Sequence, residues 1–342
     1  MPTERDPIER DADLSALSTF RLPAKAAELA TLDDADALPG LLETERPVLL
    51  LGEGSNTVFV DDYPGRVVLN RLRGIDSEVI DQDRVLVTAA AGENWHELVR
   101  WSLDRGLWGL ENLAMIPGLV GAAPMQNIGA YGVELAHCLD AVEVFDRRSG
   151  RRRWLETADC GLDYRDSRFK GADADRFVIL AVRMELMMHG TPVVEYPSLI
   201  AELKRHGHSQ PDDPRTVAAA VMRVRKRKLP DPGRIPSAGS FFKNPVLRRA
   251  DARELIDRYP EMPNWPDKPG MIKLSAAWMI DELGWRGRAV GGAEVFERHA
   301  LVLTNRGDAT GRDLLSLAGA IRDSVAERFG VRLEPEPILI GA

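Results

Sequence analysis

Short apolar segments that resemble strands recur along the chain up to residue 182, and no regular helix separates each one from the next. The segments are Pro47–Leu51, Val67–Leu69, Val85–Val87, Val142–Phe145 and Phe177–Val182. A parallel α/β domain would alternate each strand with a helix. The mixed pattern therefore predicts an α+β fold.

The predicted helices have recognisable ends. One starts after Asn94, with its apolar residues on one face. A second starts at Pro214, because proline is favoured in the first helical turn. A third follows Thr310, which begins a capping box, and ends at Gly330. The tail Val331–Glu336 after this helix is predicted to be a strand that returns to the first domain.

Length and charge limit the class of protein. A chain of 342 residues predicts two or three domains, and its high charged content is typical of a soluble globular protein. It has no apolar run of about 18 residues, which a membrane span needs. The polar start Met1–Asp6 is not expected to be a signal peptide, and Cys138 and Cys160 are expected to be reduced thiols in the cytoplasm. The net charge of −8 argues against nucleic-acid binding, so local cations at 223–228 would have to meet any anionic ligand.

The loop Gly52–Asn56 follows a predicted strand and contains two glycines, a serine and an asparagine. Successive backbone N–H groups in such a loop can bind an anion. The loop lacks the third glycine of the dinucleotide fingerprint and the lysine of a Walker loop. A plain turn between strands explains the same residues equally well.

The segment Ile116–Gly132 contains four glycines and three alanines. Small residues let the backbone approach a large flat ligand, and a helix with a small-residue face would fit against a planar ring. Close packing between helices is the alternative explanation. Two small-residue segments in one domain favour a cofactor with both a pyrophosphate and a ring system.

Two further motifs could carry chemistry. Ser240 lies on a small-residue turn close in sequence to Lys228, and a serine beside a cation can donate a proton to a strongly basic carbon. Arg165 offers a bidentate, permanently charged group for a carboxylate or phosphate. A turn serine and a solvated loop are the ordinary alternatives.

The acidic tail and the histidines give weaker signals. Glu334 and Glu336 would share one side of an extended strand, so one could be a catalytic carboxylate and both could equally belong to an exposed tail. His206 and His208 have no third ligand placed to complete a site, so no metal site is predicted.

Taken in order, these segments resemble one family, the UDP-N-acetylenolpyruvoylglucosamine reductases of bacterial peptidoglycan synthesis, in its type I form with a tyrosine-bearing loop. The resemblance runs from about Leu17 to the end of the chain. Two departures are Ser18, where asparagine is usual, and Met125, where isoleucine is commoner. The most specific segments are Gly52–Asn56, Glu111–Gly118, Gln126–Gly132, Tyr164–Ser167, Ala238–Pro245 and Leu333–Glu336.

The resemblance implies a domain plan. Residues 13–200 would form an FAD-binding domain of the vanillyl-alcohol-oxidase type, divided into two subdomains near residue 75. A linker at 201–212 would lead to a smaller α+β substrate-binding domain at 213–325. The segment 326–342 is expected to return to the active site.

The resemblance also implies the site residues. Ser240 would be the proton donor, and Arg165 and Glu336 the other catalytic residues. FAD would be held without a covalent bond, with its pyrophosphate on the Gly52–Asn56 loop and its flavin against Ile116–Gly132. The residues expected to bind FAD are Gly52, Glu53, Gly54, Ser55, Asn56, Ile116, Pro117, Gly118, Gln126, Asn127, Gly129 and Ala130, and those expected to meet the substrate are Tyr131, Tyr196, Lys228 and Asn244.

The implied activity is the NADPH-dependent, FAD-mediated reduction of UDP-N-acetylglucosamine enolpyruvate to UDP-N-acetylmuramate. The expected enzyme is a cytoplasmic monomer that binds a UDP-sugar and NADPH, and neither a nucleic acid nor a membrane. One alternative is another FAD oxidase or dehydrogenase of the same fold. The other is a nucleotide-sugar binding protein without redox chemistry.

Overall fold

The computed structural model describes residues 8–342, and the contacts within it define two compact units. The first unit comprises the residues up to Ala12, Ala27–Glu53 and Pro64–Arg227. The second comprises Asp13–Ala26, Gly54–Tyr63 and Lys228–Ala342. These boundaries differ from those of the predicted domains, because two short N-terminal stretches group with the C-terminal region. The start Met1–Asp6, predicted not to be a signal peptide, lies outside the described residues.

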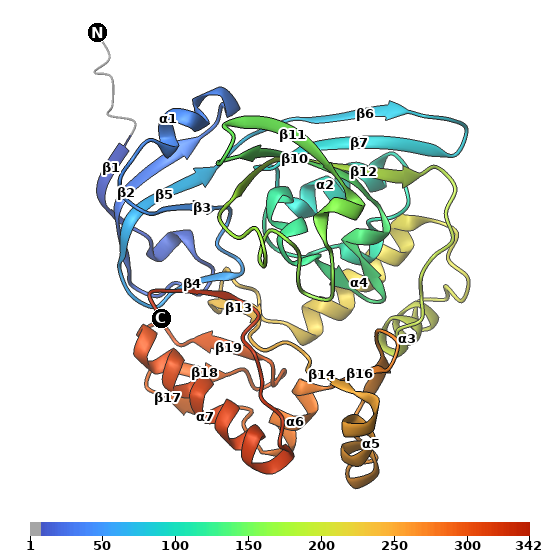
Figure 1. Cartoon of the computed structure of the whole chain (residues 1–342). Coiled ribbons are helices and arrows are strands. Elements are labelled where there is room, and N and C mark those ends of the chain that lie inside the picture. Colours follow the sequence, from blue (N-terminus) through green and yellow to red (C-terminus); the bar gives the residue numbers. More distant parts are fainter. Residues whose placement is uncertain (1–7) are drawn as a thin grey trace. The chain divides into compact units, whose positions relative to one another are not determined.

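The first unit contains two main sheets (Figure 1). The smaller has the strand order β1-β2-β5-β3, and the larger is antiparallel with the order β11-β10-β12-β7-β6. All five strand segments predicted from the sequence are confirmed, with only Pro47 lying outside its strand, which begins at Val48. The strands are β1 Ile8–Asp13, β2 Lys25–Leu32, β3 Val48–Leu51, β5 Tyr63–Asn70, β6 Ile75–Val79, β7 Arg84–Ala90, β10 Leu139–Asp146, β11 Arg151–Glu156 and β12 Phe177–Met187.

Helices α2, α3 and α4 of the first unit pack in one core with the five-stranded sheet, whereas α1 packs in a second core through Leu38. The predicted start of α2 is confirmed, since the Asn94 side chain accepts a hydrogen bond from the Glu97 amide. Residues 201–205 of the predicted linker are instead the second half of α3, because Leu199 and Leu203 are buried in the core that contains the five-stranded sheet. The helices are α1 Leu38–Leu42, α2 Trp95–Asp104, α3 Pro197–Arg205 and α4 Pro214–Lys228, the last of which ends one residue into the second unit.

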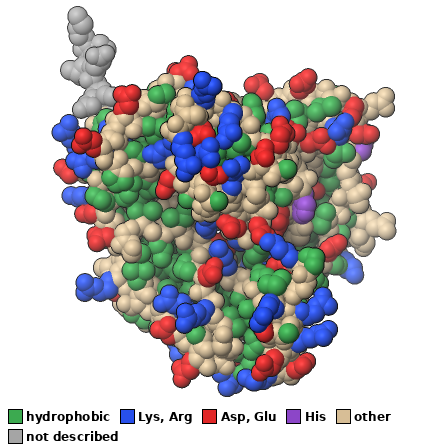
Figure 2. All heavy atoms as spheres, viewed as in Figure 1, with side chains coloured by type: hydrophobic (Ala, Val, Ile, Leu, Met, Phe, Trp, Pro, Cys, Tyr) green, Lys and Arg blue, Asp and Glu red, His purple; other side chains and the backbone are tan. Residues whose placement is uncertain are grey.

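Arginine side chains gather over the β10–β11 hairpin on the face drawn in Figure 2. Their charges are matched within the unit, because Asp146 forms ion pairs with Arg153 (3.4 Å) and Arg176 (2.8 Å). Hydrogen bonding from Arg176 lowers the pKa of Asp146 to about 2. The guanidinium carbons of Arg153, Arg168 and Arg176 also lie 4.7 to 5.3 Å from the centre of the Phe177 ring. This basic surface is therefore built into the packing of the sheet.

The second unit contains three sheets and three helices. Their orders are β13-β19-β18-β17, β14-β16-β15 and β20-β4. Helix α7 lies beside β17 and β18 (Figure 1). Its predicted capping box at Thr310 and its end at Gly330 are confirmed. The elements are β4 Thr57–Phe59, β13 Ser237–Ser240, β14 Val246–Arg248, β15 Asn264–Pro266, β16 Met271–Leu274, β17 Ala289–Val290, β18 Ala293–Val295, β19 Val302–Asn305, β20 Ile338–Ile340, α5 Arg249–Arg258, α6 Ala276–Glu282 and α7 Gly311–Phe329.

The tail strand predicted at Val331–Glu336 is wrong. Pairing starts later, where β20 joins β4 in parallel with Ile338 opposite Thr57. Within the predicted segment only an isolated bridge joins Pro335 to Phe242. Pro335 and Pro337 lack the N–H groups that a ladder needs, so they delay the strand.

None of the helices within residues 8–342 is long and apolar enough to cross a membrane. Over the same residues, no group of three or more His, Cys, Asp or Glu side chains could hold a metal ion. Cys138 and Cys160 are both free and buried.

Candidate active site

The loop Gly52–Asn56 is tied to the protein by its single acidic side chain. In the first unit, the Glu53 carboxylate accepts hydrogen bonds from Asn94 Nδ2 (2.8 Å) and from the Gly118 amide (3.0 Å). This engages the only carboxylate of the loop with protein donors. The rest of the loop has backbone N–H, hydroxyl and amide groups, a neutral donor set that fits a pyrophosphate. Glu53 thus supports the loop through its side chain, which leaves its backbone for the predicted cofactor contact.

The other end of the loop belongs to the second unit and is equally constrained. Gly54 has a φ of 62°, and a Cβ there would lie 2.1 Å from the Leu17 carbonyl oxygen. Ser18 Oγ donates to the Thr57 carbonyl (2.7 Å), so the serine at the family's usual asparagine position has its own structural partner. Asn56 Nδ2 donates to the Glu336 carbonyl at 3.4 Å. The loop therefore has a fixed path.

The segment Ile116–Gly132 is not the small-residue helix predicted from its composition. It consists of 3₁₀ turns at Val120–Ala122 and Pro124–Gln126, followed by a hairpin of β8 (Gly129–Ala130) and β9 (Val133–Glu134). Prolines at 117 and 124 and left-handed backbone at several positions interrupt a regular helix. The alternative explanation, close packing, applies at Gly121, where a Cβ would lie 2.6 Å from Ala91 Cβ.

Asn127 holds the centre of this segment. Its φ is 45°, and its Nδ2 donates to Glu134 Oε2 (2.8 Å) and to the Asp163 carbonyl (3.3 Å). Its Oδ1 accepts from the Ala136 amide (3.0 Å). The side chain of this predicted cofactor residue is therefore used within the protein. The neighbouring predicted FAD residues Ile116, Gln126, Gly129 and Ala130 are half-buried, Pro117 is exposed, and Gly118 is a buried glycine with a φ of 117°.

Left-handed backbone is concentrated in this part of the first unit. Of the seven non-glycine residues with positive φ among residues 8–342, four are Met115, Asn127, Tyr131 and Arg165. Such conformations are costly for residues with a Cβ, and they persist where function or surrounding structure demands them. Tyr131 and Gly132 are the two central residues of the β8–β9 hairpin, and both have positive φ, as a tight hairpin requires.

Arg165 and Arg225 form a concentrated positive charge in the first unit. Arg165 Nη2 donates to the Gly129 carbonyl at 2.8 Å. Arg225 has a buried Nε without a hydrogen-bond partner, and no ion pair of Arg225 occurs within residues 8–342. Burial lowers the pKa of Arg225, and the nearby positive charge of Arg165 lowers it further, while Tyr131 opposes the shift. Two guanidinium groups within electrostatic range of each other are suited to bind an anion, such as a carboxylate or phosphate.

The two predicted substrate tyrosines meet beside these arginines. The rings of Tyr131 and Tyr196 pack edge to face, with centroids 5.7 Å apart. Burial raises the pKa of Tyr131, and the charge of Arg225 opposes the rise. Tyr196, just before α3, keeps 39% of its surface exposed. The structure thus brings Arg165, Tyr131 and Tyr196 into one region of the first unit.

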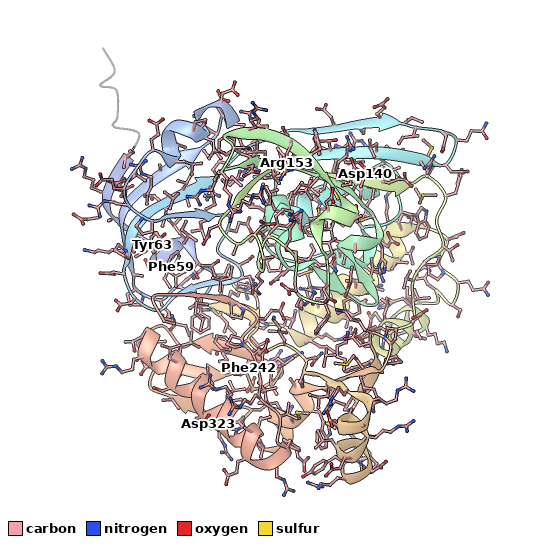
Figure 3. The ribbon with its side chains drawn as sticks, viewed as in Figure 1. Phe59, Tyr63, Asp140, Arg153, Phe242 and Asp323 are labelled. Carbon is pink, nitrogen blue, oxygen red and sulfur yellow. The ribbon has the colours of Figure 1, made fainter. Side chains whose placement is uncertain are left out.

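The second unit brings Ser240 and Glu336 together. Ser240 ends β13 opposite Val302, directly after Gly239 with its φ of 72°. The Glu336 amide donates to the Phe241 carbonyl at 2.9 Å, so the tail lies along the residues that follow the serine. Phe241 and Phe242 are core residues, exposed by 1% and 2% (Phe242 is labelled in Figure 3). This packing fixes the backbone that carries the Ser240 hydroxyl.

The remaining predicted substrate residues also lie in the second unit. Asn244 Oδ1 accepts a hydrogen bond from the Ala276 amide at the start of α6 (3.0 Å). Lys228 is exposed at the end of α4. Burial lowers the pKa of His299, and the positive charge of Lys228 adds to this shift.

Two residues of the first unit that matter to the site, His96 and Arg225, carry no distinctive motif, and a third, Asn112, lies in the family segment Glu111–Gly118 but was not predicted as a site residue. Asn112 Nδ2 donates to the carbonyls of Tyr131 (2.9 Å) and Val193 (2.8 Å). His96 Nδ1 accepts from the Met115 amide (3.1 Å), which places the imidazole proton on Nε2. Arg225 was marked in the sequence only as one member of a basic run. Its position on the buried side of α4, at helical spacing from Ala218 and Val221, is the signal that could have separated it from its exposed neighbours.

Glu111 in the same region gives a pH prediction. Its carboxyl group is buried, accepts from the Gly109 amide (2.7 Å), and has a pKa raised by burial. The folded protein keeps a proton that the unfolded chain releases above about pH 4.3, so the contribution of Glu111 to stability falls as pH rises through this window. We expect Glu111→Gln, which keeps the acceptor oxygen, to gain stability relative to the original protein between pH 5 and pH 8. The measurement is the urea-unfolding midpoint of both proteins at pH 5 and at pH 8. The same difference between the two midpoints at both pH values would contradict the prediction.

Comparison with known proteins relates both units to one group of enzymes. A family model described as the UDP-N-acetylenolpyruvoylglucosamine reductase C-terminal domain matches residues 231–340, and one described as an FAD binding domain matches residues 27–156. The UDP-N-acetylenolpyruvoylglucosamine reductase of Azoarcus sp. is 46% identical, covering 97% of this chain and 98% of the relative. That of Burkholderia multivorans is 45% identical, with 96% of each chain covered.

Solved structures agree with this result. The crystal structure of UDP-N-acetylenolpyruvylglucosamine reductase (MurB) from Thermus caldophilus aligns with a TM-score of 0.66 and 27% identity, covering 97% of this chain and 98% of that one. A solvent-stable cholesterol oxidase aligns with a TM-score of 0.50 and 12% identity, covering 98% and 88%. At that identity the second likeness concerns the fold alone.

Proposed function

The chain belongs to the family of UDP-N-acetylenolpyruvoylglucosamine reductases, FAD-dependent enzymes of peptidoglycan synthesis, and we propose that NADPH is its reductant and that Ser240, Arg165 and Glu336 carry its chemistry. Its fold is α+β, with an FAD-binding domain of the vanillyl-alcohol-oxidase type. The observation that carries the proposal is the end-to-end similarity to the Azoarcus enzyme. We also propose a cytoplasmic monomer, as the resemblance implies.

The proposed reaction saturates a carbon–carbon double bond. When bound, FAD supplies hydride transfer from NADPH to the terminal carbon of the enolpyruvyl group. Arg165 holds the adjacent carboxylate, on which negative charge develops as an enediolate. Ser240 then gives its proton to the carbon next to that carboxylate, which completes the addition of one hydride and one proton. Glu336 either orients the carboxylate or shares the proton.

The proposed cofactor contacts follow from the donor groups described above. The Gly52–Asn56 loop would hold the pyrophosphate through backbone N–H groups, with Glu53 anchoring the loop. The segment Ile116–Ala130 would meet the ring, supported by His96 and Asn127. The cationic pair Arg165 and Arg225 offers a second anion site in the same unit, which supports an acidic substrate.

Spectroscopy and turnover test the proposal together. We expect the purified protein to be yellow with a flavin spectrum and to sustain multiple turnovers of NADPH only when UDP-N-acetylglucosamine enolpyruvate is added. Rapid oxygen consumption without that substrate would identify a flavin oxidase instead. A colourless protein that does not take up FAD would favour a nucleotide-sugar binding protein.

A further inference from the structure

Glu202 on α3 is a fully buried carboxylate surrounded by cations. Its side chain is 0% exposed, and its oxygens contact Arg205 Nη1 (2.5 Å), Arg227 Nη2 (2.5 Å), Arg223 Nε (2.9 Å) and His206 Nε2 (3.1 Å). The combined positive charge of the three arginines is larger than the single negative charge of the carboxylate. A buried carboxylate with this many donors is therefore held firmly in one position.

The four contacts divide by where their donors lie. Arg205 and His206 are three and four residues after Glu202, so they do not link it to another helix. Arg223 and Arg227 belong to α4 and are one helical turn apart on the same face. These two arginines therefore bridge α3 to α4. Apolar contacts between the two helices are non-directional and would allow α3 to slide along α4. The hydrogen bonds of Glu202 are directional, so they fix the position of α3 along α4.

Helix α3 in turn carries Tyr196. The Tyr196 carbonyl accepts hydrogen bonds from the amides of Leu199 and Ile200, both at 2.9 Å, so this residue is part of the first turn. Its ring packs edge to face on Tyr131. Tyr131 itself lies near Arg225, which is near Arg165. A shift of α3 along α4 would therefore move the Tyr196 ring away from Tyr131 and from these arginines.

We propose that Glu202 is a positioning residue that locks α3 to α4 through Arg223 and Arg227, and so holds Tyr196 over the bound nucleotide-sugar. The substrate part of this inference rests on the proposed function. Glu202 itself lies on the side of α3 that meets α4, so its effect on substrate is transmitted through the helix. Loss of the lock then weakens substrate binding without changing the reaction of NADPH with the flavin.

The test compares Glu202→Gln with Arg205→Gln in the FAD-loaded full-length protein. For Glu202→Gln we expect faster amide hydrogen exchange in residues 197–205 and a KM for the UDP-sugar raised about tenfold, the factor typical of one lost charge-assisted hydrogen bond. Both kcat and the rate of flavin reduction by NADPH should stay within about twofold. Arg205→Gln removes a contact to the same carboxylate from within α3, and it should leave exchange and KM unchanged.

A double variant separates the lock from a direct contact. If Arg227 acts through Glu202, Glu202→Gln with Arg227→Gln should raise KM no further than the larger single effect. Additive effects would mean that Arg227 binds the substrate itself and would overturn the proposal. Faster exchange without a change in KM, or an equal rise in KM for Arg205→Gln, would overturn it too.

Two further outcomes remain informative. If Glu202→Gln does not fold, Arg223→Gln removes a single bridging bond from a half-exposed side chain and should produce the same two changes at smaller size; their absence would contradict the lock. If the original protein shows no turnover of the UDP-sugar, the proposed function fails. The exchange measurements on the same variants still decide whether Glu202 anchors α3.

Discussion

Ser240→Ala is expected to leave flavin reduction by NADPH nearly intact and to slow the second half-reaction by about 10³- to 10⁴-fold, the upper part of the range for a lost general acid. The hydroxyl ends β13 on a backbone fixed by the core residue Phe241 and by the Glu336 amide. Removing one oxygen therefore removes the proton source with little change in the strand. Anaerobic stopped-flow measurements of flavin absorbance separate the two steps, because each changes the spectrum in the opposite direction.

Ser237→Ala is the matched control for this variant. Ser237 starts the same strand and is buried, and its backbone N–H and carbonyl bind Thr19. The same chemical change at this position should therefore leave both half-reactions within a few-fold of the original rates. An equal loss of both half-reactions in Ser240→Ala would contradict the role of Ser240 as proton donor.

Arg165→Met should slow the second half-reaction by about 10²- to 10³-fold, the cost of losing a preorganised group that stabilises developing negative charge. Arg165 Nη2 is held by the Gly129 carbonyl, and its left-handed φ of 52° fixes the start of the side chain. Arg165→Lys keeps the charge but loses the two-pronged geometry, so it should recover only part of the rate. Single-turnover reoxidation by the UDP-sugar measures the effect.

Arg100→Met provides the comparison for Arg165. Arg100 lies in the same unit, but its side chain is exposed and forms a surface ion pair with Glu97 three residues earlier. Surface pairs of this kind contribute little. If Arg165→Met instead lost FAD, or slowed both half-reactions alike, Arg165 would be a structural residue and the assignment would fail.

Elements with complete local signals could be predicted from the sequence. Helix α2 has a capping side chain at Asn94, and α7 has a capping box at Thr310 and a glycine end at Gly330. Each signal acts within one helical turn, so no distant contact can override it easily. The prediction of a strand at Val331–Glu336 was wrong for two reasons. The pairing partner, β4, lies about 280 positions earlier in the chain, and prolines moved the start of pairing to Ile338.

The site was predictable as a set of segments but not as a geometry. The sequence pointed to Asn127 and Glu53 as cofactor residues, but it could not show that their side chains form hydrogen bonds within the protein. Arg225 could not be separated from the run at 223–228 by charge alone, because only the direction in which a helix faces tells a buried arginine from an exposed one. Glu202 lay inside a predicted linker and had no motif at all.

The order in which the second unit's parts occur along the chain affects how the protein is made. Its three stretches end at residues 26, 63 and 342, and β20 reaches almost to the last residue. A nascent chain on the ribosome can complete the contacts of the first unit once residue 227 has emerged, but the early stretches of the second must wait until Lys228–Ala342 has been made. During that interval Phe20 and Val58, both fully buried in the finished core, lack the core residues from Ala238 onward that cover them, so chaperone dependence should concentrate there.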